Sequence, residues 1–213
     1  MEKFTGQIEW LRNRLEEPLP GRNAQERMIG RVLPIPKVAP VNARLSAVLC
    51  LLFPVAGELN ILLMKRMEDG TAHSGQVSFP GGSYEPEDIE LKNTALREAE
   101  EEVGIIANRV DVLGALTPIY IPASNFNVFP FIGFISDRPT YILSHSEVAH
   151  TLEVPLKCLF HPNRKIKKDV ISPAIKKVIP NVNAYELEDD TIIWGATAMI
   201  ISELETILEE YAL

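Results

Sequence analysis

Apolar residues near the start of the chain recur at helical spacing. The pattern has four members, each three or four residues after the last: Phe4, Ile8, Leu11 and Leu15. Because polar residues fill most positions between them, this spacing predicts an amphipathic helix over residues 3–17. Pro18 and Pro20 end the helix, since proline cannot continue it. Residues 18–43 hold five prolines and predict an irregular connector that leads to the main body of the chain.

From residue 45 onward, short apolar runs bounded by turn residues predict strands. The predicted strands cover residues 46–53, 59–66, 76–79, 110–120, 127–135, 182–187 and 191–194, with a further short strand ending at residue 154. Residues 163–180 alternate basic and apolar side chains, which indicates a hairpin or a loop. One helix is predicted to begin with Pro86 in its first turn and to end at Gly104. A last helix is predicted over residues 196–211.

Strands with helices before, between and after them are typical of a sheet that is covered on both faces. The sequence contains no internal repeat and no second domain boundary, and 213 residues are enough for one substantial core. We therefore expect an α/β domain over residues 44–213, preceded by a helix and a proline-rich connector over residues 1–43.

The composition is ordinary for a soluble globular protein, with 46% hydrophobic and 23% charged residues. The longest mostly apolar stretch, residues 45–56, contains Pro54 and falls short of the roughly 20 residues that a membrane helix needs. The opening residues MEKFTGQIEW lack the apolar run of a signal peptide. Cys50 and Cys158 lie in apolar surroundings, where reduced thiols are expected. These features predict a cytoplasmic protein with no membrane partner.

The net charge of −8 bears on the choice of partner. It argues against non-specific binding to nucleic acid or to anionic membranes, because such binding depends on basic surfaces. Small anionic substrates stay possible, since metal ions and a few local Lys or Arg side chains can offset their charge.

Acidic residues cluster on the helix predicted in the middle of the chain. Glu98, Glu101 and Glu102 are spaced i, i+3, i+4 and therefore fall on one stripe of that helix, beside an apolar stripe that can face a core. Like charges at this spacing destabilise a helix, and a hard divalent cation bound among them would offset the repulsion. A solvated acidic face is the alternative interpretation, because most Glu runs are solvated.

The segment around these acids, FPGGSYEPEDIELKNTALREAEEEVGI at residues 79–105, resembles the Nudix box of the Nudix hydrolases. The pattern of that family is Gly, five residues, Glu, seven residues, Arg-Glu, an apolar residue, any residue, Glu-Glu, any residue, Gly and an apolar residue. The match has no gap from Arg97 to Ile105. Upstream, Asp88 replaces the Glu, and eight residues separate it from Arg97. Both departures resemble the branch of the family that hydrolyses coenzyme A.

The resemblance implies a Nudix-type α/β/α sandwich with a mixed central sheet and the box helix packed on it. It implies hydrolysis of a nucleoside diphosphate that is linked to another group, with water attacking one phosphorus. Mg²⁺ or Mn²⁺ is the implied cofactor, and a small-molecule nucleotide is the implied partner. By family correspondence, the metal ligands are the carboxylates of Glu98, Glu101 and Glu102 and the backbone carbonyl of Gly82.

The resemblance also assigns roles beside the metal. Arg97 is expected to fix a box carboxylate by a charge-assisted hydrogen bond, with a direct phosphate contact as the alternative. The catalytic base is expected to be Glu101 or Glu102, and Glu147 in the loop SHSEVAH is the candidate outside the box. Homodimers are common among relatives, so the resemblance is also consistent with a homodimer.

Residues 62–82 resemble a second motif, which is found in Nudix enzymes that cleave coenzyme A. The matching residues are Leu62, Leu63, Arg66, Gly75, Phe79, Pro80, Gly81 and Gly82. Three positions depart from the motif: Met64 replaces Thr, Met67 replaces Ser, and Thr71 replaces the second Arg. The last departure removes a guanidinium that could bind a phosphate in a bidentate manner.

The sequence therefore predicts a metal-dependent pyrophosphohydrolase of coenzyme A or a derivative, which yields adenosine 3′,5′-bisphosphate and 4′-phosphopantetheine. Lys65 or Arg66 is expected to bind the substrate in place of the missing Arg, and Phe126 is expected to stack on its base. Thr71 keeps other substrates open, namely ADP-ribose, a dinucleotide or a nucleoside triphosphate. A Nudix-fold ligand sensor without catalysis is the alternative from another class.

Overall fold

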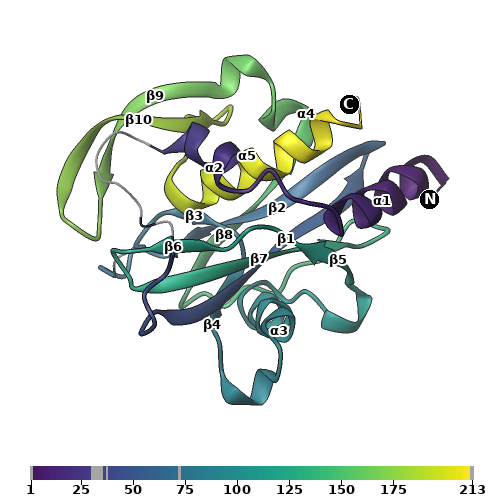
Figure 1. Ribbon diagram of the computed structural model, residues 1–213, viewed down its shortest axis with the longest axis horizontal. Coiled ribbons are helices and arrows are strands. Elements are labelled where there is room, and N and C mark those ends of the chain that lie inside the picture. Colours follow the sequence, from purple (N-terminus) through teal and green to yellow (C-terminus); the bar gives the residue numbers. More distant parts are fainter. Residues whose placement is uncertain (1, 30–35, 37, 72, 212–213) are drawn as a thin grey trace.

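A central sheet with helices on both faces makes up the molecule (Figure 1). The computed structural model describes residues 2–29, 36, 38–71 and 73–211. Helix α3 (Leu91–Val103) lies on one face of the sheet, and α1 (Glu2–Leu15) and α5 (Gly195–Glu209) lie on the other. The expected α/β/α sandwich, with the box helix packed on the sheet, is confirmed.

The central sheet is mixed, as predicted. It contains β1 (Arg44–Val55), β2 (Glu58–Arg66), β3 (Val77–Ser78), β4 (Gly81–Ser83), β5 (Asp111–Ala115), β6 (Ile119–Ile121), β7 (Phe126–Phe134) and β8 (Val148–Pro155). The order along the sheet is β3-β2-β1-β7-β5, with β4 paired to β1, β6 to β7 and β8 to β2. β1 and β7 run parallel, and the other pairs run antiparallel.

A smaller antiparallel sheet lies beside α5. Its strands, in the order β11-β10-β9, are β9 (Lys165–Ser172), β10 (Lys177–Glu186) and β11 (Ile192–Ile193). Of the two alternatives for residues 163–180, the hairpin is correct, and it continues through the strand expected at 182–187. Two one-turn helices complete the fold, α2 (Arg22–Gln25) and α4 (Leu156–Leu159). In the described part of the chain, no helix is long and apolar enough to cross a membrane.

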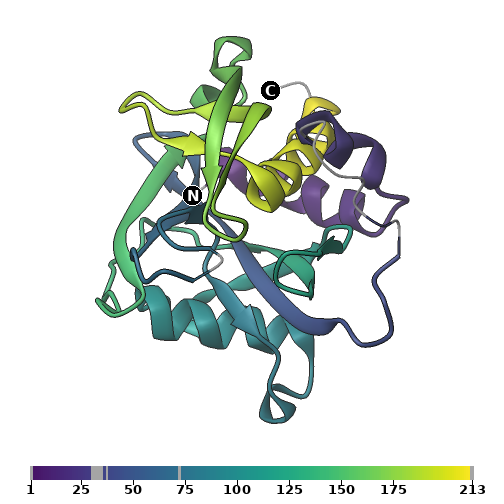
Figure 2. The ribbon, with the colours of Figure 1, turned by 90° about the vertical axis from the view of Figure 1, so that its left-hand side faces the viewer.

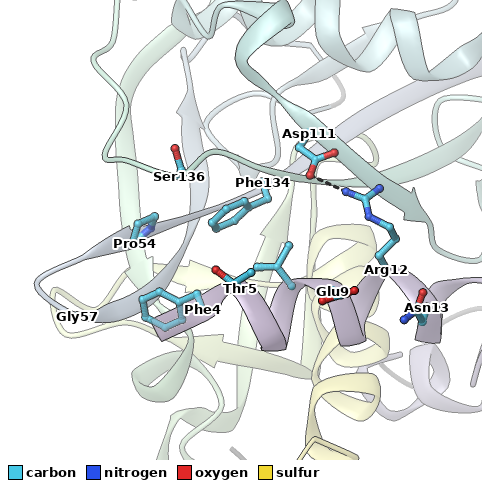
Figure 3. Close-up of a pocket in the computed structure, with 11 residues that line it drawn as sticks. Phe4, Thr5, Glu9, Arg12, Asn13, Pro54, Gly57, Asp111, Phe134 and Ser136 are labelled. Atoms are coloured by element: carbon cyan, nitrogen blue, oxygen red, sulfur yellow. Dashed lines mark hydrogen bonds and ion pairs between the residues drawn. The ribbon is translucent and has the colours of Figure 1, made fainter. Parts of the chain in front are cut away.

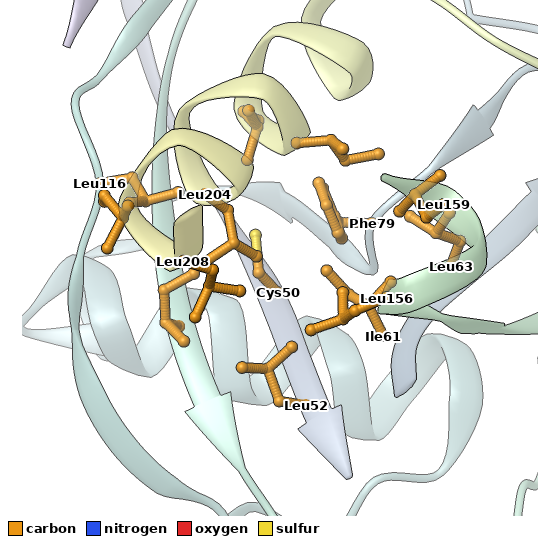
Figure 4. Packing of buried hydrophobic residues seen from close by; sticks show 14 of the residues in the cluster. Cys50, Leu52, Ile61, Leu63, Phe79, Leu116, Leu156, Leu159, Leu204 and Leu208 are labelled. Atoms are coloured by element: carbon orange, nitrogen blue, oxygen red, sulfur yellow. The ribbon is translucent and has the colours of Figure 1, made fainter. Parts of the chain in front are cut away.

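Strand β1 is buried on both faces, because successive side chains of a strand point to opposite sides. Leu49 packs with Ala99 in the apolar cluster under α3. Cys50 packs in the cluster under α5, where Figure 4 shows it with Leu204 and Leu208. A strand with two buried faces is apolar along its whole length, which explains the uninterrupted run that predicted it.

The N-terminal helix belongs to the same core. Ile8, Leu11 and Leu15 of α1 are buried in the cluster under α5. The amphipathic helix predicted from their spacing is therefore confirmed, with its apolar stripe turned to the sheet.

A buried carboxylate of α5 holds the segment that follows α1. Glu203 is fully buried and accepts hydrogen bonds from Gln25 Nε2 at 2.8 Å and from the Gly21 N–H at 3.0 Å. The Thr117 hydroxyl donates to the same carboxylate at 2.6 Å. Three donors from two other parts of the chain thus meet at one side chain that the sheet and helices exclude from water.

The prediction of an irregular connector over residues 18–43 was wrong in part. Residues 22–25 form α2, and Glu26–Met28 form a 3-10 turn. Helical pieces of three or four residues are too short to leave an apolar period in the sequence. Residues 30–35 and 37 of the connector lie outside the described residues.

The predicted start of the box helix was also wrong. Pro86 occupies the first position of a separate 3-10 turn, Pro86–Asp88, and α3 begins only at Leu91. Ile89 between them has a left-handed φ of 64°, which a continuous helix cannot contain. Pro86 is favourable at the start of either element, so the sequence did not separate them.

Two strand boundaries differ from the predictions. The strand expected at 110–120 is divided into β5 and β6, because Pro118 between them has no N–H to donate. Residues 81–83, expected as part of a turn, form β4 and pair with β1.

Replacing Glu203 with alanine tests the buried carboxylate. One N–H of the buried Gln25 amide would lose its acceptor, although the amide keeps its bond to the Thr117 carbonyl, and the partly buried Gly21 N–H and Thr117 hydroxyl would lose theirs; a buried donor without an acceptor costs about 1–3 kcal/mol. The free energy of unfolding, measured by urea denaturation, is expected to fall by about 2–4 kcal/mol. Glu209→Ala, at an exposed position of the same helix, is the control and is expected to stay within about 0.5 kcal/mol of wild type. Equal stability of the two variants would contradict the role given to Glu203.

Candidate active site

Strand β4 and helix α3 bring Gly82 into contact with Glu98. A β-carbon added to Gly82 would overlap the Glu98 carboxylate, so any larger residue would displace it. Ala99 and Val103 pack α3 on the sheet, and Gly104, with φ 74°, ends the helix in the left-handed conformation. This packing directs the acidic stripe toward β4.

Glu102 is the most deeply buried of the box acids, with 2% of its side chain exposed. One of its oxygens accepts a hydrogen bond from the Gly81 N–H at 2.8 Å, and the other accepts one from Arg66 Nη1 at 3.1 Å. Burial raises the pKa of Glu102 to about 7, although the Gly81 N–H and the Arg66 charge act against this shift. Glycine at position 81 lets β4 come close to β1, since a β-carbon there would collide with the β1 backbone.

Arg97 links the box acids to the turn that precedes the helix. Its guanidinium donates to Asp88 from Nε at 2.8 Å and from Nη2 at 3.1 Å. Nη1 donates to Glu98 at 3.1 Å and to Glu101 at 3.0 Å, and Nη2 also donates to the Ser83 carbonyl at 3.1 Å. The hydrogen bonds with Asp88 are the main reason why the pKa of Arg97 is raised. Two box carboxylates are thus held by one guanidinium.

Asp88, at the position of the motif Glu, is the buried anchor of this guanidinium. It also accepts hydrogen bonds from the Thr94 hydroxyl at 2.8 Å and from the Glu85 N–H at 3.0 Å. Its pKa is lowered to about 2, chiefly by the hydrogen bonds from Arg97, which outweigh the opposite effect of burial. The shorter Asp side chain therefore still reaches Arg97.

Glu101 and Glu147 are the more exposed acids of this region. Glu101 exposes 60% of its side chain, and its carboxylate pairs with the Arg97 guanidinium. Burial is the largest cause that raises the pKa values of Glu98 and Glu102, and the charge of Glu147 adds to both shifts. Glu147, just before β8, therefore lies close enough to act electrostatically on both box acids.

The box acids are suitable ligands for a divalent cation, but their side chains are not arranged around a common point. Among the described residues, no three His, Cys, Asp or Glu side chains are already arranged as a ligand set. Glu98, Glu101 and Glu102 nevertheless offer oxygen atoms alone, which hard divalent cations prefer. Burial disfavours the charged forms of Glu98 and Glu102 and raises their pKa values, and a bound cation would favour the charged forms. Glu101 contacts Arg97 through one carboxylate oxygen only.

A cavity of about 450 Å³ opens beside the box. Gly81 and Gly82 of β4 and Arg66 at the end of β2 form part of one side. The β9–β10 hairpin and the start of α5 form the other side. This volume lies in the range of small-molecule sites, so the box borders a space that can hold a ligand.

The residues predicted to bind the substrate occupy different places. Arg66 lines the cavity while it is paired with Glu102. Phe126 also lines the cavity, with the Arg44 guanidinium carbon 4.2 Å from its ring centroid, so one ring face is already covered. Lys65 is not among the residues that line the cavity. Neighbouring side chains of a strand point to opposite faces, and the structure brings Arg66, but not Lys65, to the candidate site.

Two polar residues that the sequence did not assign to the site also line the cavity. They are His73 and Gln76, whose side chains interact through Nδ1 and Oε1 at 3.2 Å. Thr71 lies in the same wall, where the coenzyme A motif has Arg. A single histidine such as His73, with no second ligand at metal-binding spacing, does not mark a site in the sequence. The only signal was its position between Arg66 and the box.

A larger hollow, of about 700 Å³, lies between α1 and one end of the sheet (Figure 3). Phe4 and Arg12 of α1 line it together with Phe134 and Asp111, and Arg12 pairs with Asp111. None of its lining residues belongs to the box. Its size alone therefore does not make it the candidate active site.

Comparison with known protein families matches residues 43–169 to the NUDIX domain. A relative from Yersinia enterocolitica, named an uncharacterised Nudix hydrolase, NudL, is 40% identical over 147 residues, which are 69% of this chain and 73% of the relative. The chain belongs to the Nudix hydrolase family and is a pyrophosphatase, an enzyme that hydrolyses phosphoric anhydrides. Members of this family generally use divalent metal ions.

Solved structures share the fold at lower identity. A Nudix hydrolase from M. smegmatis, RenU, has a TM-score of 0.55 and 15% identity, over 80% of this chain and 89% of that one. A MutT/nudix family protein from Enterococcus faecalis has a TM-score of 0.53 and 18% identity, over 88% of this chain and 73% of that one. At these identities the likeness supports the fold alone.

Asp88→Asn tests the anchor of Arg97. A hydrogen bond to a charged group contributes about 1.5–3 kcal/mol, so the free energy of unfolding at pH 7 is expected to fall by about 2 kcal/mol. Because the pKa of Asp88 is depressed in the folded protein, its contribution is fully present above the unfolded pKa near 4 and is lost as the pH falls through about 2. Urea denaturation of both proteins at a series of pH values should therefore show their difference shrinking below pH ~4. A difference that does not change with pH would contradict this pairing.

Proposed function

We propose that this pyrophosphatase hydrolyses coenzyme A or one of its derivatives, with Mg²⁺ as the metal and Mn²⁺ as a substitute. Water adds to one phosphorus of the anhydride, and the bond from that phosphorus to the bridging oxygen breaks. The products are adenosine 3′,5′-bisphosphate and 4′-phosphopantetheine, and the proton lost by water passes to a base.

The contact between Glu98 and the Gly82 backbone at the edge of the cavity is the observation that carries the proposal. Gly82 lines a space of ligand size, and the Glu98 carboxylate lies against the α-carbon of Gly82. Arg66, which lines the same space, supplies a positive charge. A pyrophosphate needs charge neutralisation of this kind, because negative charge develops on its oxygens during hydrolysis.

The proposed metal ligands are the carboxylates of Glu98, Glu101 and Glu102 and the carbonyl of Gly82. A bound divalent ion supplies neutralisation of the phosphate oxygens and a more acidic water. Arg97 keeps Glu98 and Glu101 in place before the ion binds, through the hydrogen bonds described above. Its full set of protein partners favours this positioning role over a direct phosphate contact.

The choice of coenzyme A depends on the motif that precedes the box. Arg66, Gly81 and Gly82 match that motif and line the cavity. Thr71 favours a second candidate, in which the same chemistry acts on ADP-ribose, a dinucleotide or a nucleoside triphosphate, since its hydroxyl cannot replace a bidentate guanidinium.

The proposed catalytic base is Glu147, in preference to the box acids first expected. Both oxygens of Glu102 already accept hydrogen bonds, and Glu101 is paired with Arg97. The Glu147 side chain makes no hydrogen bond or ion pair with any other described residue. Its charge nevertheless acts on Glu98 and Glu102, so its free carboxylate lies near the proposed metal ligands.

A product assay tests both the choice of substrate and the proposed metal ligands. With Mg²⁺ or Mn²⁺, the enzyme is expected to cleave coenzyme A faster than ADP-ribose, a dinucleotide or a nucleoside triphosphate, as followed by chromatography of the products. Glu98→Gln is expected to lower kcat by about 100-fold or more, because a neutral amide is a poor ligand for a hard cation. Glu100→Gln, at an exposed position of the same helix, is the matched control and should keep the wild-type kcat.

Two results of this assay would count against the proposal. A preference for a substrate without pantetheine would replace coenzyme A with the second candidate. Unchanged turnover in Glu98→Gln would contradict the assignment of Glu98 as a metal ligand.

Glu147→Gln tests the base. Loss of a general base typically lowers kcat by about 10²–10⁴-fold. The concentration of Mg²⁺ that gives half-maximal activity is expected to stay the same, because Glu147 is not a proposed ligand. A near-normal kcat would exclude Glu147 and return the role to Glu101 or Glu102.

A further inference from the structure

The chain bends sharply at Ile89, between the 3-10 turn Pro86–Asp88 and helix α3. Ile89 has φ 64° and ψ −51°, and the Glu90 N–H donates to the Asp88 carbonyl at 2.6 Å. A hydrogen bond across two residues with a positive φ between them defines a γ-turn of the rare and strained form. Figure 2 shows the segment between β4 and α3 extending below the helix, away from the central sheet.

The side chain of Ile89 does not favour this conformation. Isoleucine is branched at its β-carbon, and a positive φ is unfavourable for such a residue. Ile89 also exposes 81% of its surface, so its burial offsets little of the strain. The γ-turn is therefore imposed on Ile89 by the contacts of its neighbours.

The hydrogen bonds of Asp88 hold the turn in place. The Asp88 carbonyl accepts a second hydrogen bond from Asn93 Nδ2 at 2.7 Å. Its buried carboxylate is held by Thr94 and Arg97, as described above. Strained backbone persists where the surroundings over-determine it, and such places are common at functional sites. The contacts that impose the γ-turn on Ile89 are thus the same contacts that anchor Arg97.

A continuous helix would separate Asp88 from Arg97. The two residues are nine positions apart, and a helix turns about 100° and rises about 1.5 Å per residue. Nine positions correspond to roughly 900°, which is two full turns and a half turn, and to about 13.5 Å along the axis. Asp88 would then lie on the face of the helix opposite to Arg97. The bend at Ile89 instead brings Asp88 Oδ1 to 2.8 Å from Arg97 Nε.

We propose that Ile89 is a positioning residue of the enzyme, whose γ-turn holds Asp88 against Arg97. Arg97 in turn presets the carboxylates of Glu98 and Glu101 for the divalent metal ion. The inference rests on the proposed function, because these two acids are among the proposed metal ligands. The effect passes through the backbone of Ile89. Glycine can therefore replace the side chain, whereas proline, with φ fixed at about −65°, cannot form the turn.

Two substitutions at position 89 test the turn in the metal-free protein. Ile89→Pro is expected to break the turn and release Asp88. The pKa of Asp88, measured by NMR of its carboxyl group, should then rise from about 2 toward the ordinary value of about 4. Ile89→Gly should keep the pKa at about 2, since glycine adopts a positive φ without strain. An unchanged pKa of Asp88 in Ile89→Pro would overturn the inference.

Metal binding tests the positioning of the box acids. Loss of groups that orient metal ligands typically weakens metal affinity 10–100-fold, so calorimetry with Mn²⁺ is expected to give a Kd about tenfold weaker in Ile89→Pro than in wild type. Ile89→Gly should stay within about twofold of wild type, because it keeps the turn. In an Asp88→Asn background, Ile89→Pro should weaken binding by no more than about twofold further, because both residues act through one contact. Full additivity of the two effects would overturn the route through Asp88.

Two further variants separate positioning from a general loss of structure. Asp190→Pro makes the same substitution at another exposed residue with a left-handed φ, 62°, in the turn between β10 and β11. It is the matched control and should keep the wild-type Kd for Mn²⁺, and an equal loss in both proline variants would overturn the inference. Asn93→Ala removes one hydrogen bond to the turn and leaves Ile89 in place, so the test remains open if Ile89→Pro does not fold. It is expected to weaken Mn²⁺ binding by about threefold, and wild-type affinity in this variant would overturn the inference.

The outcomes also separate this inference from the proposed function. If the pKa of Asp88 rises in Ile89→Pro but the wild-type protein binds no Mn²⁺, the proposed metal ligands fail and the hold of the turn on Arg97 stands. If the wild-type protein binds Mn²⁺ and Ile89→Pro binds it equally well, the metal site stands and the positioning role of Ile89 is overturned.

Discussion

The guanidinium of Arg97 allows several acids to gather at one end of α3. Unscreened carboxylates a few ångströms apart would repel one another by several kcal/mol near a protein surface. Arg97 lies between Asp88 on one side and Glu98 and Glu101 on the other, and it donates to all three. Because Asp88 belongs to the turn before the helix, the same contacts also hold that turn against α3. The position of Glu98 beside the Gly82 backbone therefore depends on the hydrogen bonds of Arg97.

The short segment that contains β3 and β4 connects the two helical layers. At one end, the Val77 carbonyl accepts a hydrogen bond from the Thr197 hydroxyl of α5 at 3.0 Å. At the other end, the Gly81 N–H donates to Glu102 of α3. Helices α3 and α5 lie on opposite faces of the sheet (Figure 1), and this one segment is hydrogen-bonded to both.

The sequence predicted the parts of the fold that repeat an apolar period. Strands β1 and β2, helix α1 and the C-terminal half of α3 have such periods, and the structure contains them. The start of α3 was misplaced because the left-handed Ile89 leaves no pattern in the sequence. The contact of Glu203 with Gln25 was not predicted, since 178 positions separate the two residues and no local pattern marks their pairing.

In the site, the resemblance of the box named the acids, but it did not describe their surroundings. Arg66 and Lys65 were equal candidates in the sequence, and only the alternation along β2 brings one of them to the cavity. The tip of the β9–β10 hairpin also lines the cavity, through Ala174 and Ile175. Information of this kind depends on three-dimensional packing, so the sequence pattern could not supply it.

The shared core of α1 and α5 has a consequence for how this enzyme can be divided. The family match covers residues 43–169 and therefore omits both helices that shield one face of the sheet. A fragment trimmed to those limits would expose the cluster around Cys50 to water, along strands that are prone to associate edge to edge. The segment that matches the family is thus smaller than the segment that buries the core. Any chimera or minimal version of the protein has to retain both ends of the chain.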